Sequence, residues 1–407
     1  MIKKQYQEAI LNFNKCIAQS PENADVYYNR AAAYTSLGKT SEAIADYSKV
    51  ISMNEIYTSA YINRGSIYST LQKYELALKD FNKAIELKPN KSEIYNNRGY
   101  LYSMQNKHDL AIKDYNKAIE LNPHYERAYI NKAFSVSFLG DKNGAIEILS
   151  QLIKINPTVA DVYFNRALQY EAIGEKQKAL NDYNIGLELN PGDAKSLLNR
   201  CKIKDDLGDD IGAIEDCRKA LLIEPENADL YYYRARPEYD LPNYLAVIDD
   251  CSKSIELNKN YYEAYILRGN AYDLVLQYEN ALKDYSKAIE LKPDDIDGYT
   301  QRAIAKAAKK DFIGALSDLT KAISLKPTTI DLYDKRARIK YANKNYKAAI
   351  DDISICIQLQ PDDAKNYYFR GSINDLLNNK IQACEDFKMA EKLGNGAAIS
   401  KRILICN

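Results

Sequence analysis

The sequence has little of the material from which metal centres and disulfide frameworks are built. It contains only two histidines, His108 and His124, at unrelated positions, and seven cysteines at irregular spacing without a CxxC pair. A structural zinc site needs clustered thiolate or imidazole ligands, and a disulfide framework needs regularly spaced cysteines. We therefore expect no metal and no cofactor.

The chain also lacks net charge. Its 56 basic residues are balanced by 56 acidic ones, so no overall field draws it to nucleic acid or to acidic lipid. The apolar runs are short, and the opening stretch MIKKQYQEAILNF has neither the apolar core nor the cleavage site of an export signal. These absences predict a soluble, cytoplasmic protein without nucleic-acid or membrane partners. They leave its oligomeric state open.

Catalytic motifs are missing as well. The sequence has no Walker loop and no GxGxxG stretch, and neither histidine lies near an obvious Ser or Cys nucleophile. Its acidic residues are spread over predicted helix surfaces, so no pair of carboxylates stands out as catalytic. We expect the protein not to be an enzyme.

What the sequence does have is a period of 34 residues. Most of its prolines are separated by multiples of this number, namely Pro21, Pro89, Pro123, Pro157, Pro191, Pro225, Pro293, Pro327 and Pro361. Counting from three residues after each proline slot, eleven complete repeats begin at residues 24, 58, 92, 126, 160, 194, 228, 262, 296, 330 and 364. Repeats of this length indicate a stacked array of similar structural units.

Each repeat carries the same pattern of residue types. The fourth place is Tyr in ten of the eleven repeats, the eighth is always Ala, Gly or Cys, and the twentieth is Ala in ten. Apolar residues recur at three- and four-residue spacing on both sides of a polar turn, which predicts two amphipathic helices per repeat. The small residues let the two helices approach closely, and the proline ends the second helix.

This pattern resembles the tetratricopeptide repeat family, and the stretch AIKDYNKAIELNP at residues 111–123 matches the second helix of that repeat almost throughout. The resemblance covers nearly the whole chain. It implies an all-α, right-handed superhelical solenoid of 34-residue helix-turn-helix repeats. It also implies that the first helices line a concave groove, faced by places two, five, six, nine, twelve and thirteen.

The repeat frame predicts five segments. They are a partial repeat at 1–23, repeats one to six at 24–227, an irregular repeat seven at 228–261, repeats eight to eleven at 262–397, and a capping helix at 398–407. The first residue falls inside what would be a first helix. The chain is therefore either cut from a longer protein or opens with a half-repeat.

Repeat seven departs from the pattern in four places. Pro237 falls inside its first helix, Pro242 in its turn, Glu238 replaces a core Tyr, and Val247 replaces Ala. A proline at this position removes a helical hydrogen bond and crowds the preceding turn, so we expect a kink or an early helix end at Pro237. Repeat seven would then join two differently shaped segments; drift in an unused repeat is the alternative.

The cysteines fall mostly where other repeats have core residues. Cys217 and Cys251 replace Tyr or Phe, and Cys16 and Cys356 replace Ala. We expect these four to be small core residues. A bridge between Cys384 and Cys406 is conceivable, but we expect ordinary packing there.

Place seven, usually apolar in the family, is basic here. It is arginine in ten repeats, namely Arg30, Arg64, Arg98, Arg166, Arg200, Arg234, Arg268, Arg302, Arg336 and Arg370. All ten repeats have aspartate at place 23, whereas the one lysine repeat pairs Lys132 with Ile148. We infer an Arg to Asp ion pair that joins the two helices of a repeat. An arginine row that binds acidic ligands is the alternative.

Place six is asparagine in the first six repeats and in none of the last five. These residues are Asn29, Asn63, Asn97, Asn131, Asn165 and Asn199. An amide can accept from one backbone N–H and donate to one carbonyl, so a row of them could hold an extended peptide without reading its sequence. The row is similar to the asparagine ladder in the repeat arm of O-linked N-acetylglucosamine transferase. Alternatively, each amide simply bonds to a neighbouring first helix.

Aromatic residues accompany the asparagines at groove places. They are Tyr28, Tyr100, Phe134, Phe138 and Phe164. We expect a non-enzymatic scaffold that binds a peptide or helical segment of a partner protein in the concave groove. The alternatives are the substrate-recognition arm of a larger enzyme, such as a glycosyltransferase, and a structural spacer.

Overall fold

The computed structural model describes residues 2–406, and all regular structure in this range is helical. The helices are α1 (Ile2–Gln19), α2 (Ala24–Ser36), α3 (Thr40–Met53), α4 (Thr58–Thr70), α5 (Tyr74–Leu87), α6 (Ser92–Met104), α7 (His108–Leu121), α8 (Glu126–Phe138), α9 (Lys142–Ile155), α10 (Ala160–Ala172), α11 (Lys176–Leu189), α12 (Ala194–Asp206), α13 (Asp210–Ile223), α14 (Ala228–Asp240), α15 (Tyr244–Leu257), α16 (Tyr262–Leu274), α17 (Tyr278–Leu291), α18 (Ile296–Ala308), α19 (Phe312–Leu325), α20 (Ile330–Ala342), α21 (Tyr346–Leu359), α22 (Ala364–Leu376), α23 (Lys380–Lys392) and α24 (Gly396–Ile405). Each complete repeat thus contributes an even-numbered first helix and an odd-numbered second helix.

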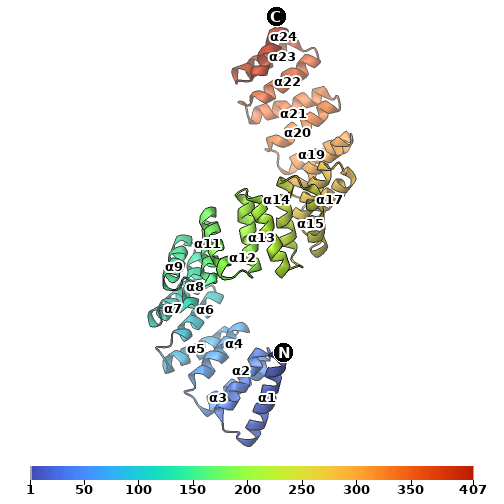
Figure 1. The fold of residues 1–407 in the computed structure, drawn as a ribbon. Coiled ribbons are helices and arrows are strands. Elements are labelled where there is room, and N and C mark those ends of the chain that lie inside the picture. The colour runs from blue at the N-terminus through green and yellow to red at the C-terminus, as the bar shows by residue number, and fades with distance from the viewer. Residues whose placement is uncertain (1, 407) are drawn as a thin grey trace. The chain divides into compact units, whose positions relative to one another are not determined.

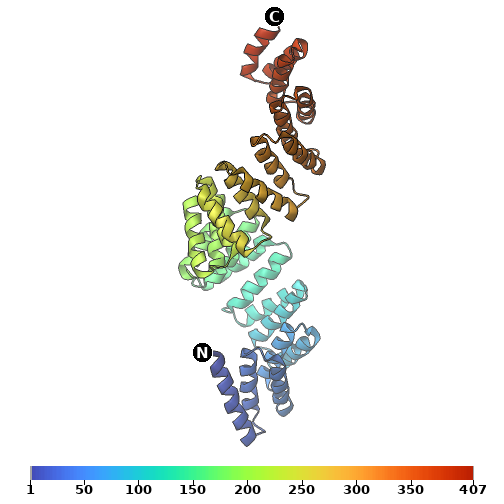
Figure 2. The same cartoon turned by 90° about the vertical axis from the view of Figure 1, so that its right-hand side faces the viewer.

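The chain forms two compact blocks, an N-terminal block up to Ser196 and a C-terminal block from Leu197 on. From α1 to α11 and from α13 to α24, each helix packs against the next one along the chain (Figures 1 and 2). Stability in such a stack is a sum of repeat and nearest-neighbour contributions. None of the helices in residues 2–406 combines the length and the apolar character needed to cross a membrane.

The small residues at places eight and twenty lie where the two helices of a repeat touch. Ala31 and Ala43 in repeat one are fully buried against the Tyr47 ring cluster. In repeat eight, a Cβ added to Gly269 would lie only 2.6 Å from Cε1 of Tyr285. The helices are packed so closely that a larger side chain would force them apart.

Each turn between the two helices of a repeat needs a left-handed residue at place fifteen. Gly38, Gly140 and Gly174 meet this need without strain, whereas Leu276 adopts φ 61° and Pro242 adopts φ 27°. The proline ring favours φ near −65°, and proline also lacks the N–H that other residues donate at this place. Repeat seven is therefore strained at its turn.

We expect Pro242→Gly to raise the free energy of unfolding by about 1 kcal/mol or more, because glycine relieves this strain. Urea unfolding followed by circular dichroism measures the change. Leu276→Gly is the matched control. It relieves the strain of a positive φ at the same place in repeat eight, but no proline ring is involved, so it should raise the stability less than Pro242→Gly does. A loss of stability in Pro242→Gly would show that the turn is not strained.

The first helix of repeat seven does not end early at Pro237. α14 runs through the proline to Asp240 and, like the other first helices, has 13 residues, so the expected early end was wrong, whereas a kink at Pro237 stays a prediction. Pro237 is buried in the fold. Packing of its ring among the neighbouring helices offsets the single helical hydrogen bond that the proline removes.

The Arg to Asp pair is confirmed in all ten arginine repeats. The aspartates are Asp46, Asp80, Asp114, Asp182, Asp216, Asp250, Asp284, Asp318, Asp352 and Asp386. In Arg166, for example, Nε and Nη2 donate to the two carboxylate oxygens of Asp182 at 2.7 Å each. The Asp182 side chain is only 5% exposed, so the bidentate pair is shielded from water. Burial without an aspartate lowers the pKa of Lys132.

The arginines also join successive repeats, which we did not predict. Arg166 Nη1 donates to Ser150 Oγ of the preceding repeat at 2.9 Å, and Arg64 Nη1 donates to Ser48 Oγ at the same distance. Equivalent bonds come from Arg30, Arg98, Arg268, Arg302, Arg336 and Arg370. Place 25 carries Ser, Thr or Asn before each of these arginines, so the signal was present in the sequence.

Two of the cysteine expectations were wrong. Cys384 and Cys406 form a disulfide that ties α24 to α23, and Cys16 is exposed. Cys16 lies on α1, in the partial repeat at the start of the described residues. Cys251 and Cys356 are buried as expected, whereas the buried Cys217 is bridged to Cys201.

Candidate functional site

Four first helices of the N-terminal block lie side by side. α4 contacts α6, α6 contacts α8, and α8 contacts α10. Their place-six and exposed aromatic residues form what we call the amide–aromatic face. It consists of Asn63, Asn97, Tyr100, Asn131, Phe134, Phe138 and Asn165.

Two of these amides bond to the preceding first helix. Asn63 Nδ2 donates to Tyr28 Oη at 3.0 Å and to Tyr47 Oη at 3.1 Å. Asn131 Nδ2 donates to Asn96 Oδ1 at 3.0 Å. In both cases place five of the preceding repeat is polar, so the asparagine finds a partner within the stack.

For Asn97 and Asn165, place five of the preceding repeat is apolar. It is Ile62 before Asn97 and Ile130 before Asn165, so neither amide has a polar partner there. Asn165 Nδ2 turns to the carbonyl of Asp161 in its own helix, at 2.7 Å. Asn97 accepts a bond from Asn96 at 3.4 Å, while its own Nδ2 donates to no group within residues 2–406. Asn97 therefore keeps hydrogen-bonding capacity.

The remaining two asparagines of the row lie outside these four helices. Asn29 is exposed on α2, and Asn199 lies on α12 in the C-terminal block. The structure thus places four of the six predicted amides on one set of adjacent helices.

Three of the predicted aromatic residues are strongly exposed. Phe134 is 61% exposed, Phe138 59% and Tyr100 52%. Phe134 and Phe138 lie one helical turn apart on α8, with ring centroids 6.5 Å apart. An exposed pair of phenylalanines is costly in water unless something covers it.

The other two predicted aromatics serve packing. Phe164 is 8% exposed and closes against Gly186, where an added Cβ would lie 2.3 Å from its ring. Tyr28 lies between Tyr47 and Tyr57, with centroids 5.6 and 5.1 Å away. Burial and a hydrogen bond to Asp25 raise the pKa of Tyr57 to about 12.

His108 belongs to this region, although the sequence analysis gave it no role. Its ring stacks on Phe138 with centroids 4.1 Å apart, and the residue is only 3% exposed. Neither ring nitrogen has a hydrogen-bond partner in the described part of the chain. One face of the Phe138 ring therefore covers the His108 imidazole, while the rest of the ring is exposed to solvent.

A hollow of about 280 Å³ opens beside Asn97 and Tyr100. Its other lining residues are Ser66, Ser69, Thr70, Phe81 and Met104. Ser66, Ser69, Thr70 and Met104 occupy places nine, twelve and thirteen, which the family resemblance had already assigned to the groove. Polar hydroxyls and an amide surround apolar side chains here, a mixture suited to a peptide.

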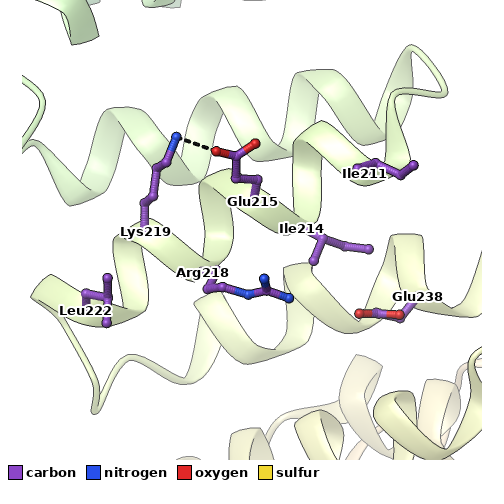
Figure 3. A pocket seen from close by; sticks show the side chains of 7 residues that line it. All are labelled: Ile211, Ile214, Glu215, Arg218, Lys219, Leu222 and Glu238. Atoms are coloured by element: carbon purple, nitrogen blue, oxygen red, sulfur yellow. Dashed lines mark ion pairs between the residues drawn. The ribbon is translucent and has the colours of Figure 1, made fainter.

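A second hollow, of about 570 Å³, lies on α13 in the C-terminal block (Figure 3). It is lined by Ile211, Ile214, Glu215, Arg218, Lys219 and Leu222 of α13 and by Glu238 of α14. Lys219 and Glu215 form an ion pair of 2.7 Å along the helix. Since nearly all lining residues belong to one helix, this is a surface depression and not an enclosed cavity.

Family models identify the repeats. Residues 24–57, 58–91, 92–125 and 262–295 match one model described as tetratricopeptide repeat, residues 126–159 match a second with that description, and residues 1–38 match a model described as TPR repeat. These matches confirm tetratricopeptide repeats at residues 1–159 and 262–295, and the structure shows an all-α solenoid. Repeats of this kind support a protein-interaction scaffold.

No curated protein matches the chain. Among solved structures, MamA is 26% identical over 41% of this chain and 92% of its own, with a TM-score of 0.39. Yeast Tom70 is 17% identical over 94% of both chains, with a TM-score of 0.42. Cut9–Hcn1 of the APC/C is 14% identical over 100% and 94%, with a TM-score of 0.48. At these TM-scores, none of the likenesses supports a statement about function.

Proposed function

We propose that the amide–aromatic face binds an extended or helical segment of a partner protein, so that the chain acts as a non-enzymatic scaffold. The observation that carries this proposal is the exposure of Tyr100, Phe134 and Phe138 on adjacent helices beside the amides. Covering one such ring contributes roughly 1.5–3 kcal/mol. Three rings would supply most of the affinity of a typical peptide complex.

The polar groups would align the segment. Asn97 retains an unused donor at the edge of the hollow, and the hydroxyls of Ser66 and Thr70 line the same space. An amide that donates to a ligand carbonyl recognises the backbone and not the side chain. The expected partner is therefore a peptide anchored by apolar residues, with limited sequence selectivity.

The bonds of Asn63 and Asn131 within the stack favour a second candidate, a structural spacer without a ligand in the groove. In that case the amides serve only to hold successive first helices together. The two functions differ in whether the exposed rings are used.

We expect Tyr100→Ala combined with Phe134→Ala to weaken peptide binding by about 10- to 100-fold, because two exposed anchors are lost. Random twelve-residue peptides displayed on phage are selected on the wild-type protein. Their affinities are then measured by fluorescence anisotropy.

Leu76→Ala is the matched control, since Leu76 is 46% exposed on the second helix α5. The control should bind as the wild type does, and all three proteins should share the same melting temperature. Peptides that bind the double variant as tightly as the wild type, or a failure to select any peptide, would favour the spacer.

A further inference from the structure

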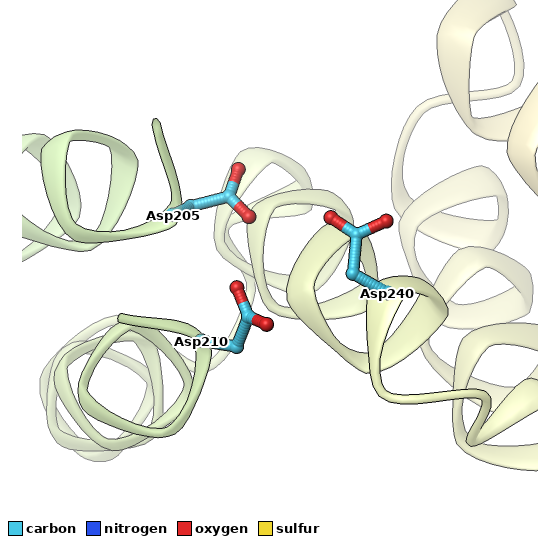
Figure 4. Close-up of side chains that lie close together, drawn as sticks. All are labelled: Asp205, Asp210 and Asp240. Atoms are coloured by element: carbon cyan, nitrogen blue, oxygen red, sulfur yellow. The ribbon is translucent and has the colours of Figure 1, made fainter. Parts of the chain in front are cut away.

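Three carboxylates from three helices converge in the C-terminal block. Asp205 ends the last full turn of α12, Asp210 begins α13, and Asp240 ends α14 (Figure 4). One oxygen from each lies within 4.8 Å of the other two. Like charges at this separation repel strongly unless a cation lies among them.

The most deeply buried of the three side chains is that of Asp205. It is 2% exposed, and its buried Oδ2 accepts no hydrogen bond within residues 2–406, although it forms an ion pair with Arg236. Arg236 Nη2 lies 3.0 Å from this oxygen without hydrogen-bonding geometry, and it is also 3.7 Å from Asp206. One guanidinium carries a single positive charge, whereas the three ionised carboxylates carry three negative ones.

Two of the three helix ends add to the negative potential, whereas Asp210 lies in the first turn of α13, where the helix carries a partial positive charge. Asp205 and Asp240 lie in the final turns of α12 and α14, where the free carbonyl groups give each helix a partial negative charge. Acidic side chains at these ends cost stability by themselves. A bound cation would turn both the carboxylates and the helix ends into favourable partners.

We propose that Asp205, Asp210 and Asp240 form a calcium site that links repeats six and seven. Carboxylate oxygens suit a hard divalent cation. Ca²⁺ binds oxygen at about 2.3–2.6 Å, so two ligand oxygens on opposite sides of the ion are about 4.6–5.2 Å apart. Mg²⁺ binds oxygen at about 2.1 Å, so the same separation is at most about 4.2 Å. The three oxygens lie within 4.8 Å of one another, which is inside the span of a calcium site. Water would complete the coordination.

The test uses the full-length protein stripped of metal, and calcium chloride is titrated into it in a calorimeter. Burial raises the pKa of Asp205 to about 6, with Asp240, Asp206 and Asp210 adding to the effect and Arg236 opposing it. The titration is therefore run above pH 7. We expect one calcium ion per chain and a rise in melting temperature with calcium concentration.

The variant Asp210→Asn with Asp240→Asn should weaken calcium binding at least about tenfold. Asp249→Asn, which removes one negative charge from an exposed place on α15, should bind as the wild type does and is the matched control for Asp240→Asn alone. Circular dichroism establishes whether each variant is folded. If the double variant is not folded, the single variant Asp240→Asn takes its place.

No calcium binding by the wild type, or equal binding by the double variant, would overturn the proposal. Binding of magnesium chloride but not of calcium chloride would overturn the choice of metal. A lower melting temperature in calcium would show that the carboxylates do not gain from the ion.

Discussion

Replacing Asp182 by alanine is expected to lower the free energy of unfolding by about 3–5 kcal/mol. The substitution leaves the Arg166 guanidinium, which is 17% exposed, without the carboxylate that receives two of its hydrogen bonds. An unpaired charge in such a place keeps its desolvation cost and loses its compensation. Urea unfolding of the wild type and the variant measures the difference.

Two further variants show whether the cause is the unpaired charge. Lys132→Ala, at the same place in the repeat that lacks an aspartate, should change stability far less, because it removes a charge that has no aspartate partner. Arg166→Met with Asp182→Leu removes both charges and should lie close to the wild type. Identical unfolding of Asp182→Ala and the wild type would show that the pair does not stabilise the fold.

Removing the disulfide between Cys384 and Cys406 is expected to cost about 3 kcal/mol at the C-terminal end. The bridge closes a loop with a sequence separation of 22 residues, and a loop of this length restricts the unfolded chain by about that amount. In Cys384→Ala with Cys406→Ala, α24 should separate from α23 and exchange its amide hydrogens faster. Hydrogen exchange monitored by mass spectrometry measures this.

Cys16→Ala serves as the control for that experiment, because Cys16 is exposed and unbridged. Unchanged exchange of α24 in the double variant would show that packing alone holds the helix.

Thiol titration of the denatured, unreduced protein should find three free cysteines and not seven. Disulfides persist in oxidising compartments, so a cytoplasmic location would require both bridges to be reduced.

Much of the fold follows from the sequence because its determinants are local. Small residues at places eight and twenty, proline after the second helix, and the pairing of arginine with aspartate sixteen residues later all act within one repeat. Within 34 residues the chain has few ways to pair two helices, so the pattern determines the contact. Arg166 and Asp182 illustrate this: the two residue types vary together across the repeats, and the structure joins them.

The candidate site was predictable only in part. The amides of Asn97 and Asn131 were expected to lie on neighbouring first helices, and they do. Whether an amide remains available, however, depends on place five of the preceding repeat, as the different bonding of Asn97 and Asn131 shows. Likewise Phe134, at place nine of its repeat, is exposed, whereas Phe164, at place five, is buried against Gly186 of its second helix.

The sequence by itself determined the repeats, their helices and the ion pair inside each of them, because these depend on residues at fixed short spacing along one chain segment. Only the tertiary structure decided that Cys384 reaches Cys406, that α14 continues through Pro237, and that three aspartates from three helices converge. Such meetings depend on how one repeat is stacked on the next. These residues do not recur in every repeat, so the 34-residue pattern does not predict which residues of the neighbouring repeat they contact.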